Sequence, residues 1–142
     1  MNTGAESVLH VVDLGHRAYG PVLQLQEQIV EERKAGRIPD TLLLVEHDPV
    51  YTLGRNARDG NIVASRDELR RMGVEVVKIG RGGDVTYHGP GQLVGYPIIH
   101  LKERGRSIVG YVDGLEQTIL RVLEAYGIHG GTDRKNRGVW VG

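Results

Sequence analysis

The chain has 142 residues, its 18 basic and 18 acidic side chains balance to a net charge of zero, and it contains no cysteine. This length fits one domain with its own core, and the balanced charge gives no reason to expect binding to nucleic acid or to an anionic membrane. The missing cysteines exclude disulfides, cysteine-based metal sites and a thiol nucleophile. Because the apolar runs are too short to span a membrane and the first ten residues do not resemble a signal peptide, we expect a cytoplasmic protein.

The first third of the chain predicts a strand, a helix and two further strands. The β-branched run Val8 to Leu14 is typical of a strand. Apolar residues spaced by three and four predict an amphipathic helix from about Arg17 to Ala35. The apolar runs Thr41 to His47 and Val50 to Gly54 predict two strands, separated by a turn. Since His-Asp-Pro is typical of a turn, we interpret His47 as a structural residue.

The middle of the chain predicts a short helix and two strands. Ser65 and Glu68 form a capping box, which indicates a helix from Arg66 to Met72. The runs Val74 to Ile79 and Leu93 to Leu101 are typical of strands, and a glycine-rich stretch lies between them.

The last third predicts a long helix and one more strand. Ser107 is a helix cap, and the apolar residues from Ile108 to Tyr126 then recur at steps of four and three. The run Gly138 to Gly142 begins a strand. Because short turns join several strands, we expect an α+β fold with a mixed, largely antiparallel sheet packed with helices, rather than a doubly wound parallel sheet.

The stretch RGGDVTYHGPGQLVGYP, from Arg81 to Pro97, contains more glycine than a plain turn needs. A dinucleotide-binding fingerprint requires a third glycine where Val85 stands, and it requires a helix where a strand is predicted. The Gly-Lys-Ser/Thr of a P-loop and the catalytic triplet of a protein kinase are both missing. We therefore do not expect these common kinds of phosphate binding.

The segment DVTYH, from Asp84 to His88, alternates as a strand does. Its valine and tyrosine face one side, while its aspartate, threonine and histidine face the other, with Arg81 at the entrance. Backbone N–H groups that glycine leaves accessible can hold a carbonyl oxygen or an oxyanion. The combination indicates a binding site.

Each of these features also has a simpler interpretation. Gly-Pro-Gly can be only a turn, His88 a hydrogen-bonded structural histidine, and Arg81 a solvated charge. Asp84 and His88 could form a metal pair, but the sequence supplies no third ligand.

The stretch from Arg81 to Pro97 resembles the signature of the lipoyl(octanoyl) transferases, and VEHDPVYTLGR, from Val45 to Arg55, resembles a second block of that family. The resemblance covers essentially the whole chain and implies the fold of the biotin and lipoate protein ligases. It implies that octanoyl passes from acyl carrier protein to an enzyme cysteine. The acyl group then passes to a lysine of the lipoyl domains of 2-oxoacid dehydrogenase complexes or of the glycine cleavage H protein. It implies no nucleotide, metal or redox cofactor.

The same resemblance implies an acyl-substrate site formed by eight consecutive residues, among which the family varies at the aspartate. These residues are Arg81, Gly82, Gly83, Asp84, Val85, Thr86, Tyr87 and His88. The family's catalytic lysine and cysteine follow the GVWV strand, so both would lie beyond Gly142. The resemblance thus implies that residues 1–142 are the N-terminal part of one catalytic domain and are inactive alone in octanoyl transfer.

Two other functions remain open from the sequence. An ATP-dependent lipoate or biotin protein ligase shares the fold, but it would adenylate its acid, whereas a transferase ignores ATP. A non-catalytic module that binds an acyl group or a protein is the third hypothesis, because the chain has no cysteine.

Overall fold

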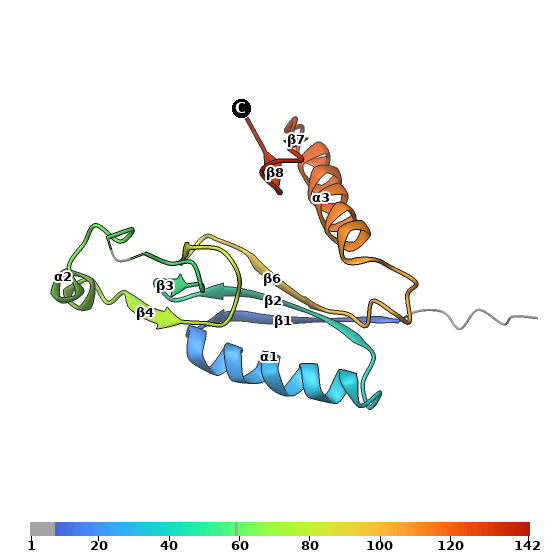
Figure 1. The fold of residues 1–142 in the computed structure, drawn as a ribbon, viewed down its shortest axis with the longest axis horizontal. Coiled ribbons are helices and arrows are strands. Elements are labelled where there is room, and N and C mark those ends of the chain that lie inside the picture. The colour runs from blue at the N-terminus through green and yellow to red at the C-terminus, as the bar shows by residue number, and fades with distance from the viewer. Residues whose placement is uncertain (1–7, 59) are drawn as a thin grey trace, which may run out of the picture. The chain divides into compact units, whose positions relative to one another are not determined.

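The computed structural model describes residues 8–58 and 60–142 (Figure 1). The chain divides into two compact units, residues 1–99 and 100–142, and each is described by itself. The expectation of a single catalytic domain over 1–142 stays a prediction. None of the described helices is long and apolar enough to cross a membrane.

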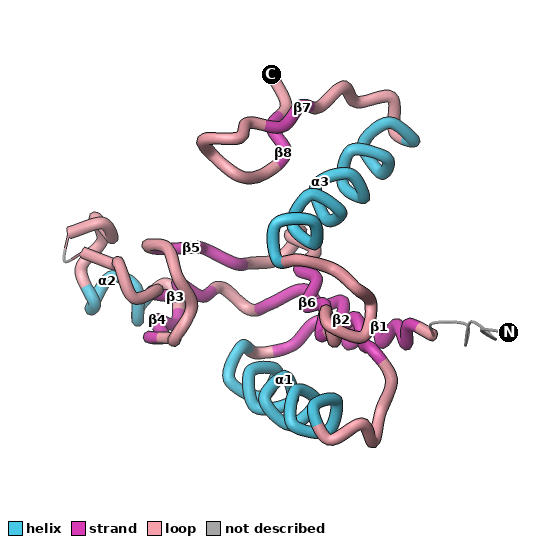
Figure 2. Tube along the Cα trace, turned by 45° about the vertical axis from the view of Figure 1, so that its right-hand side comes forward, coloured by secondary structure: helices cyan, strands magenta, loops and turns pink. Residues whose placement is uncertain are grey.

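The first unit contains all the elements that the sequence predicts there, with end points shifted by a few residues at most (Figure 2). They are β1 (Leu9–Arg17), α1 (Tyr19–Lys34), β2 (Asp40–His47), β3 (Val50–Leu53), α2 (Arg66–Arg71), β4 (Glu75–Lys78), β5 (Val85–His88) and β6 (Val94–Ile98).

Two three-stranded sheets organise this unit, with the strand orders β1-β2-β6 and β4-β3-β5. β2 pairs parallel with β1 and antiparallel with β6. β3 pairs parallel with β4 and antiparallel with β5. Only Asp48 and Pro49 separate β2 from β3, so the chain passes directly from one sheet to the other. The mixed pairing confirms the predicted α+β class.

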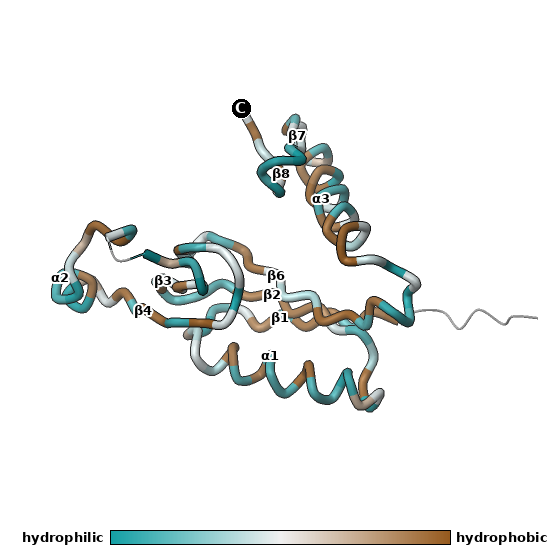
Figure 3. The backbone as a smooth tube through the Cα atoms, in the orientation of Figure 1, coloured by the Kyte–Doolittle hydropathy of each residue, from teal (hydrophilic) through white to brown (hydrophobic). Residues whose placement is uncertain are grey.

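The core of the first unit lies between β2 and α1, which runs along one face of the first sheet (Figure 1). Leu43 and Val45 alternate on the buried face of β2, and Tyr19 and Val22 are the buried side chains of α1. Figure 3 shows that apolar and polar residues follow one another along α1, as expected of a helix with one buried side. Burial of each of these large apolar side chains contributes about 1.5–3 kcal/mol. By the same alternation, His47 lies two residues after Val45 on the buried face of β2.

The second unit consists of α3 (Ile108–Ala125), β7 (Gly131–Thr132) and β8 (Val139–Trp140). The Ser107 hydroxyl caps α3 by accepting a 3.1 Å hydrogen bond from the Gly110 N–H, which confirms the predicted cap. The buried Glu116 carboxylate accepts a 2.8 Å bond from the Gly138 N–H and fixes the start of β8 on α3. Ile108 is 74% exposed and Tyr126 79% exposed, so both ends of the predicted apolar stripe of α3 are open to solvent.

Candidate functional site

The loop of residues 81–84 is closely packed against the segment that follows β3. Three of its carbonyl oxygens accept hydrogen bonds of 2.8–3.0 Å from the backbone N–H groups of residues 54–56. A Cβ atom on Gly54 would lie 2.5 Å from the carbonyl oxygen of Gly83, so only glycine fits at position 54. This packing fixes the path of the loop.

Unlike these carbonyls, the backbone N–H groups of Gly82 and Gly83 take part in no hydrogen bond to a described residue. Both glycines are exposed. Gly83 has φ +81°, which favours glycine, whereas a side chain on Gly82 would meet open space. The two N–H groups are thus available to donate to an oxygen atom of a ligand.

The Arg81 guanidinium is fixed above the second sheet by four hydrogen bonds. Its Nη2 donates to the carbonyl and hydroxyl of Thr52, at 2.9 and 3.0 Å, and to the hydroxyl of Thr86, at 2.7 Å. Its Nη1 donates to the Gly82 carbonyl at 2.9 Å. Because Thr52 is completely buried and pairs with Thr86 across β3 and β5, the positive charge has a defined position beside the glycine loop. Arg81 is therefore anchored, and its interpretation as a solvated charge is wrong.

The predicted alternation along β5 holds for the four residues of the strand. Tyr87 packs against Tyr51 with ring centroids 5.1 Å apart, and Val85 shares that side by alternation. Thr86 and His88 occupy the other side, where Arg81 lies.

Asp84 does not join that polar face. It precedes β5, and its carboxylate accepts a hydrogen bond from the Asn61 side chain. The structure therefore brings together three of the four polar side chains that the sequence predicted, and Asp84 binds elsewhere.

A cluster of aromatic and imidazole rings surrounds His88. The Tyr19 ring is stacked parallel to it at a centroid distance of 6.4 Å, and the His47 ring lies 5.8 Å away. His47 is completely buried: its Nδ1 lies 3.1 Å from the Arg17 carbonyl and its Nε2 lies 2.9 Å from the Tyr96 hydroxyl. Since a carbonyl only accepts, Nδ1 carries the proton, and Nε2 accepts the hydrogen bond that Tyr96 donates.

Burial disfavours the charged forms of His47, Tyr96 and Tyr19. Burial lowers the pKa of His47 from its ordinary value of 6.5, although the hydrogen bond to the Arg17 carbonyl opposes this. Burial also raises the pKa of Tyr96 to about 12, with a smaller contribution from Tyr19. Burial raises the pKa of Tyr19 as well, and the nearby Arg81 charge acts in the opposite direction.

The Gly-Pro-Gly sequence forms a β-turn that folds the chain back onto His88. The Gln92 N–H donates to the Gly89 carbonyl at 3.1 Å, and Gly91 has φ +84°. Proline in the second position and a left-handed glycine in the third are the requirements of a type II turn. The Glu46 carboxylate accepts a 2.8 Å bond from the Gly91 N–H and ties the turn to β2.

Several residues of this cluster were missed from the sequence. His47 was interpreted as structural only, although its alternation with Leu43 and Val45 was a signal that it joins the buried face of β2. Gln92 was also missed, although it lies in the glycine-rich stretch and reaches His88 through the local Gly-Pro-Gly turn. The other residues gave no local signal, since tertiary packing and strand register bring them to the site. They are Tyr19, Thr52 and Tyr96.

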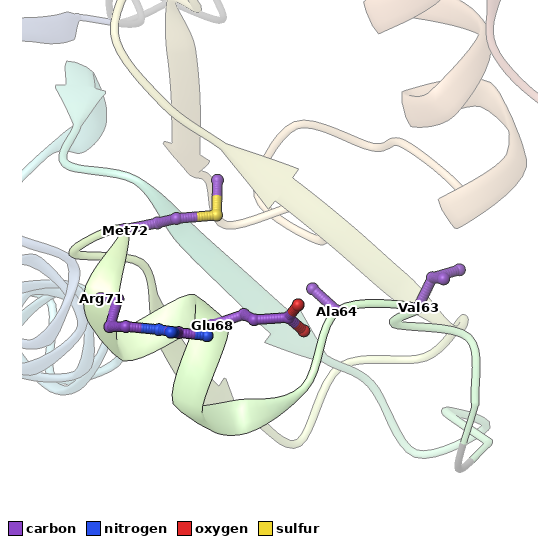
Figure 4. A pocket seen from close by; sticks show the side chains of 5 residues that line it. All are labelled: Val63, Ala64, Glu68, Arg71 and Met72. Carbon is purple, nitrogen blue, oxygen red and sulfur yellow. The ribbon is translucent and has the colours of Figure 1, made fainter.

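A separate surface hollow of about 540 Å³ lies beside α2, and Figure 4 shows the five side chains that line it. They are Val63, Ala64, Glu68, Arg71 and Met72. Glu68 is already engaged there in the capping box with Ser65, and none of the eight predicted site residues lines the hollow. Among the described residues, no group of three histidine or acidic side chains is placed to hold a metal ion.

Comparison with known proteins supports the resemblance seen in the sequence. The chain is 49% identical over 133 residues to an octanoyltransferase of Chloroflexus aggregans, with 94% of this chain and 60% of that protein covered. It is 48% identical over 132 residues to an octanoyltransferase of Syntrophobacter fumaroxidans, with 93% and 58% covered. The chain thus spans less than two thirds of the length of these curated relatives.

Solved structures support the fold. LipL1 of P. falciparum in complex with lipoate matches with a TM-score of 0.64 at 18% identity, over 94% of this chain and 40% of that one. A putative lipoate protein ligase of T. acidophilum matches with a TM-score of 0.63 at 15% identity, over 96% and 55%. The model of the lipoyl protein ligase A/B catalytic domain matches residues 18–142. The chain therefore belongs to the family of the lipoyl protein ligase A/B catalytic domain.

Proposed function

We propose that this chain provides the acyl-binding part of an octanoyltransferase, which moves an octanoyl group from acyl carrier protein to a lysine of a lipoyl domain. The observation that carries the proposal is the loop of residues 81–84. Its carbonyls accept hydrogen bonds from the segment after β3, while the N–H groups of Gly82 and Gly83 have no partner among the described residues. The sequence identity of 48% and 49% to two proteins named octanoyltransferase supports octanoyl as the acyl group.

In this proposal the N–H groups of Gly82 and Gly83 and the guanidinium of Arg81 bind the carbonyl oxygen of the acyl thioester. Such donors stabilise the negative charge that develops on that oxygen when the carbonyl carbon is attacked. Their fixed positions matter because a preorganised site needs little rearrangement during the reaction. Thr86 contributes by holding Arg81, and His88 borders the same face.

The overall reaction breaks the C–S bond of the thioester and forms an amide C–N bond, while the proton of the lysine amine passes to the released thiol. A thioester is already activated, so this exchange needs no ATP. The proposed acceptors are lipoyl domains of 2-oxoacid dehydrogenase complexes and the glycine cleavage H protein, and the proposed compartment is the cytoplasm. The chain has no cysteine, so the enzyme thioester that the family resemblance implies has no attachment point within residues 1–142.

The test adds a non-hydrolysable amide analogue of octanoyl-pantetheine to the 142-residue chain. Nuclear magnetic resonance monitors its binding through the backbone amide shifts. The expected result is a set of shift changes at the Gly82 and Gly83 amides that Arg81→Ala reduces. ATP is the comparison ligand. Shift changes at this loop with ATP and octanoic acid, and none with the analogue, would favour an ATP-dependent ligase.

A further inference from the structure

Gln92, at the end of the type II turn, is hydrogen-bonded to the imidazole of His88. Its side-chain Oε1 is 2.5 Å from His88 Nδ1, and its side-chain Nε2 is 3.3 Å from the Tyr87 carbonyl oxygen. The turn makes this contact by bringing a residue four positions along the chain back onto the strand end.

These two contacts determine where the proton of His88 lies. The Tyr87 carbonyl can only accept, so the amide nitrogen of Gln92 must face it. The amide oxygen therefore faces His88, and since that oxygen only accepts, Nδ1 must carry the proton. In neutral His88 the lone pair is then on Nε2, which has no hydrogen-bond partner among the described residues.

We propose that Gln92 is a positioning residue that holds His88 in the tautomer with the proton on Nδ1. In this tautomer Nε2 accepts a hydrogen bond from the amine of the acceptor lysine while the amine lone pair approaches the acyl carbon. The identity of that donor rests on the proposed function, whereas the tautomer rests on the contacts alone.

Groups from three other parts of the chain lie around His88. The Tyr19 ring stacks on it from α1, the buried His47 ring lies beside it from β2, and Arg81 bonds to its neighbour Thr86 on the same face. The Glu46 carboxylate accepts a hydrogen bond from the Gly91 N–H of the turn. The neutral amide of Gln92 orients the ring without adding a charge.

The first measurement is the pair of ¹⁵N shifts of His88 in the 142-residue chain, assigned with His88→Gln. We expect a protonated Nδ1 and an unprotonated Nε2 at alkaline pH, and a mixture of tautomers in Gln92→Leu. Gln24→Leu, on the exposed side of α1, is the matched control and should leave the shifts unchanged. A proton on Nε2 of the parent, or an unchanged tautomer in Gln92→Leu, would overturn the inference.

The second measurement is octanoyl transfer against pH by the complete gene product. Gln92→Leu should lower kcat about tenfold or more with a small change in KM, because loss of a correctly oriented base affects the chemical step. Gln92→Glu keeps the acceptor oxygen and should restore activity, with the acid limb of the profile moved to higher pH because a carboxylate stabilises protonated His88. Equal pH profiles for all three proteins would contradict the role.

The two measurements separate the inference from the proposed function. If the tautomer is as expected but no octanoyl is transferred, the proposed function fails and the orientation by Gln92 stands. If octanoyl is transferred but the proton lies on Nε2 of His88, the inference fails and the proposed function stands.

Discussion

His47 and Tyr96 form a buried hydrogen bond of 2.9 Å between a ring that is wholly inaccessible to solvent and the hydroxyl of β6. Tyr96→Phe removes the donor and leaves His47 Nε2 buried without a partner. We expect the free energy of unfolding to fall by about 1–3 kcal/mol, measured by urea denaturation. Tyr126→Phe, at a position that is 79% exposed, should change it by less than about 0.5 kcal/mol. Equal stability of the two variants would contradict the buried bond.

The lowered pKa of His47 predicts a dependence of stability on pH. Burial favours the neutral ring in the folded state, so between the two pKa values the unfolded chain binds more protons than the folded chain. The contribution of neutral His47 to the free energy of unfolding is complete above pH 6.5, the ordinary pKa of histidine. This contribution is lost as the pH falls from 6.5 through the lower pKa that His47 has in the folded protein. His47→Gln should reduce the slope of unfolding free energy against pH in this window. An unchanged slope would show that His47 is not the group responsible.

Arg81→Lys tests whether the geometry of the guanidinium matters as well as its charge. Lysine keeps the charge but cannot bond at once to Thr52, Thr86 and the Gly82 carbonyl. We expect the Kd for the octanoyl-pantetheine analogue to rise about tenfold, as for the loss of one charged hydrogen bond. Arg71→Lys, at an exposed position of α2, is the control. Equal affinity of both variants would mean that Arg81 does not hold the acyl group.

The glycines near the loop predict three different outcomes when each is replaced by alanine. Gly54→Ala places a Cβ 2.5 Å from the Gly83 carbonyl, and such overpacking should cost about 1–3 kcal/mol of stability. Gly83→Ala introduces strain of about 1 kcal/mol at φ +81°.

A Cβ on Gly82 would meet no described atom within 4 Å apart from its chain neighbours, so we expect normal stability in Gly82→Ala. Because the methyl group would occupy space that the proposed site gives to the acyl analogue, we expect weaker binding. Thermal unfolding and titration calorimetry on the same samples separate these effects. Full affinity in Gly82→Ala would remove this glycine from the proposed site.

Local sequence patterns were enough to predict most of the fold. The capping box of Ser65 and Glu68 and the cap at Ser107 are interactions over three residues, so the sequence contains all of their determinants. The alternation along β5 likewise follows from the strand repeat. β7 was not predicted, because two residues are too few to show a period.

The site could be predicted only where its residues are consecutive. The loop of residues 81–84 and Thr86 were found together because they lie in one stretch of sequence. Thr52 joins them through the register of β3 with β5, and Tyr96 through the pairing of β6 with β2. Asp84 was misplaced, since its bond to Asn61 depends on a loop 23 residues away.

The most direct test of the proposed acyl transfer uses the complete gene product, octanoyl-acyl carrier protein and an apo-lipoyl domain, with no ATP present. Intact-mass spectrometry of the lipoyl domain reports whether its lysine gains an octanoyl group. We predict octanoylation without ATP and its loss in the Arg81→Ala variant. Octanoylation that requires ATP and free octanoic acid, or that is unchanged in Arg81→Ala, would contradict the proposed acyl site.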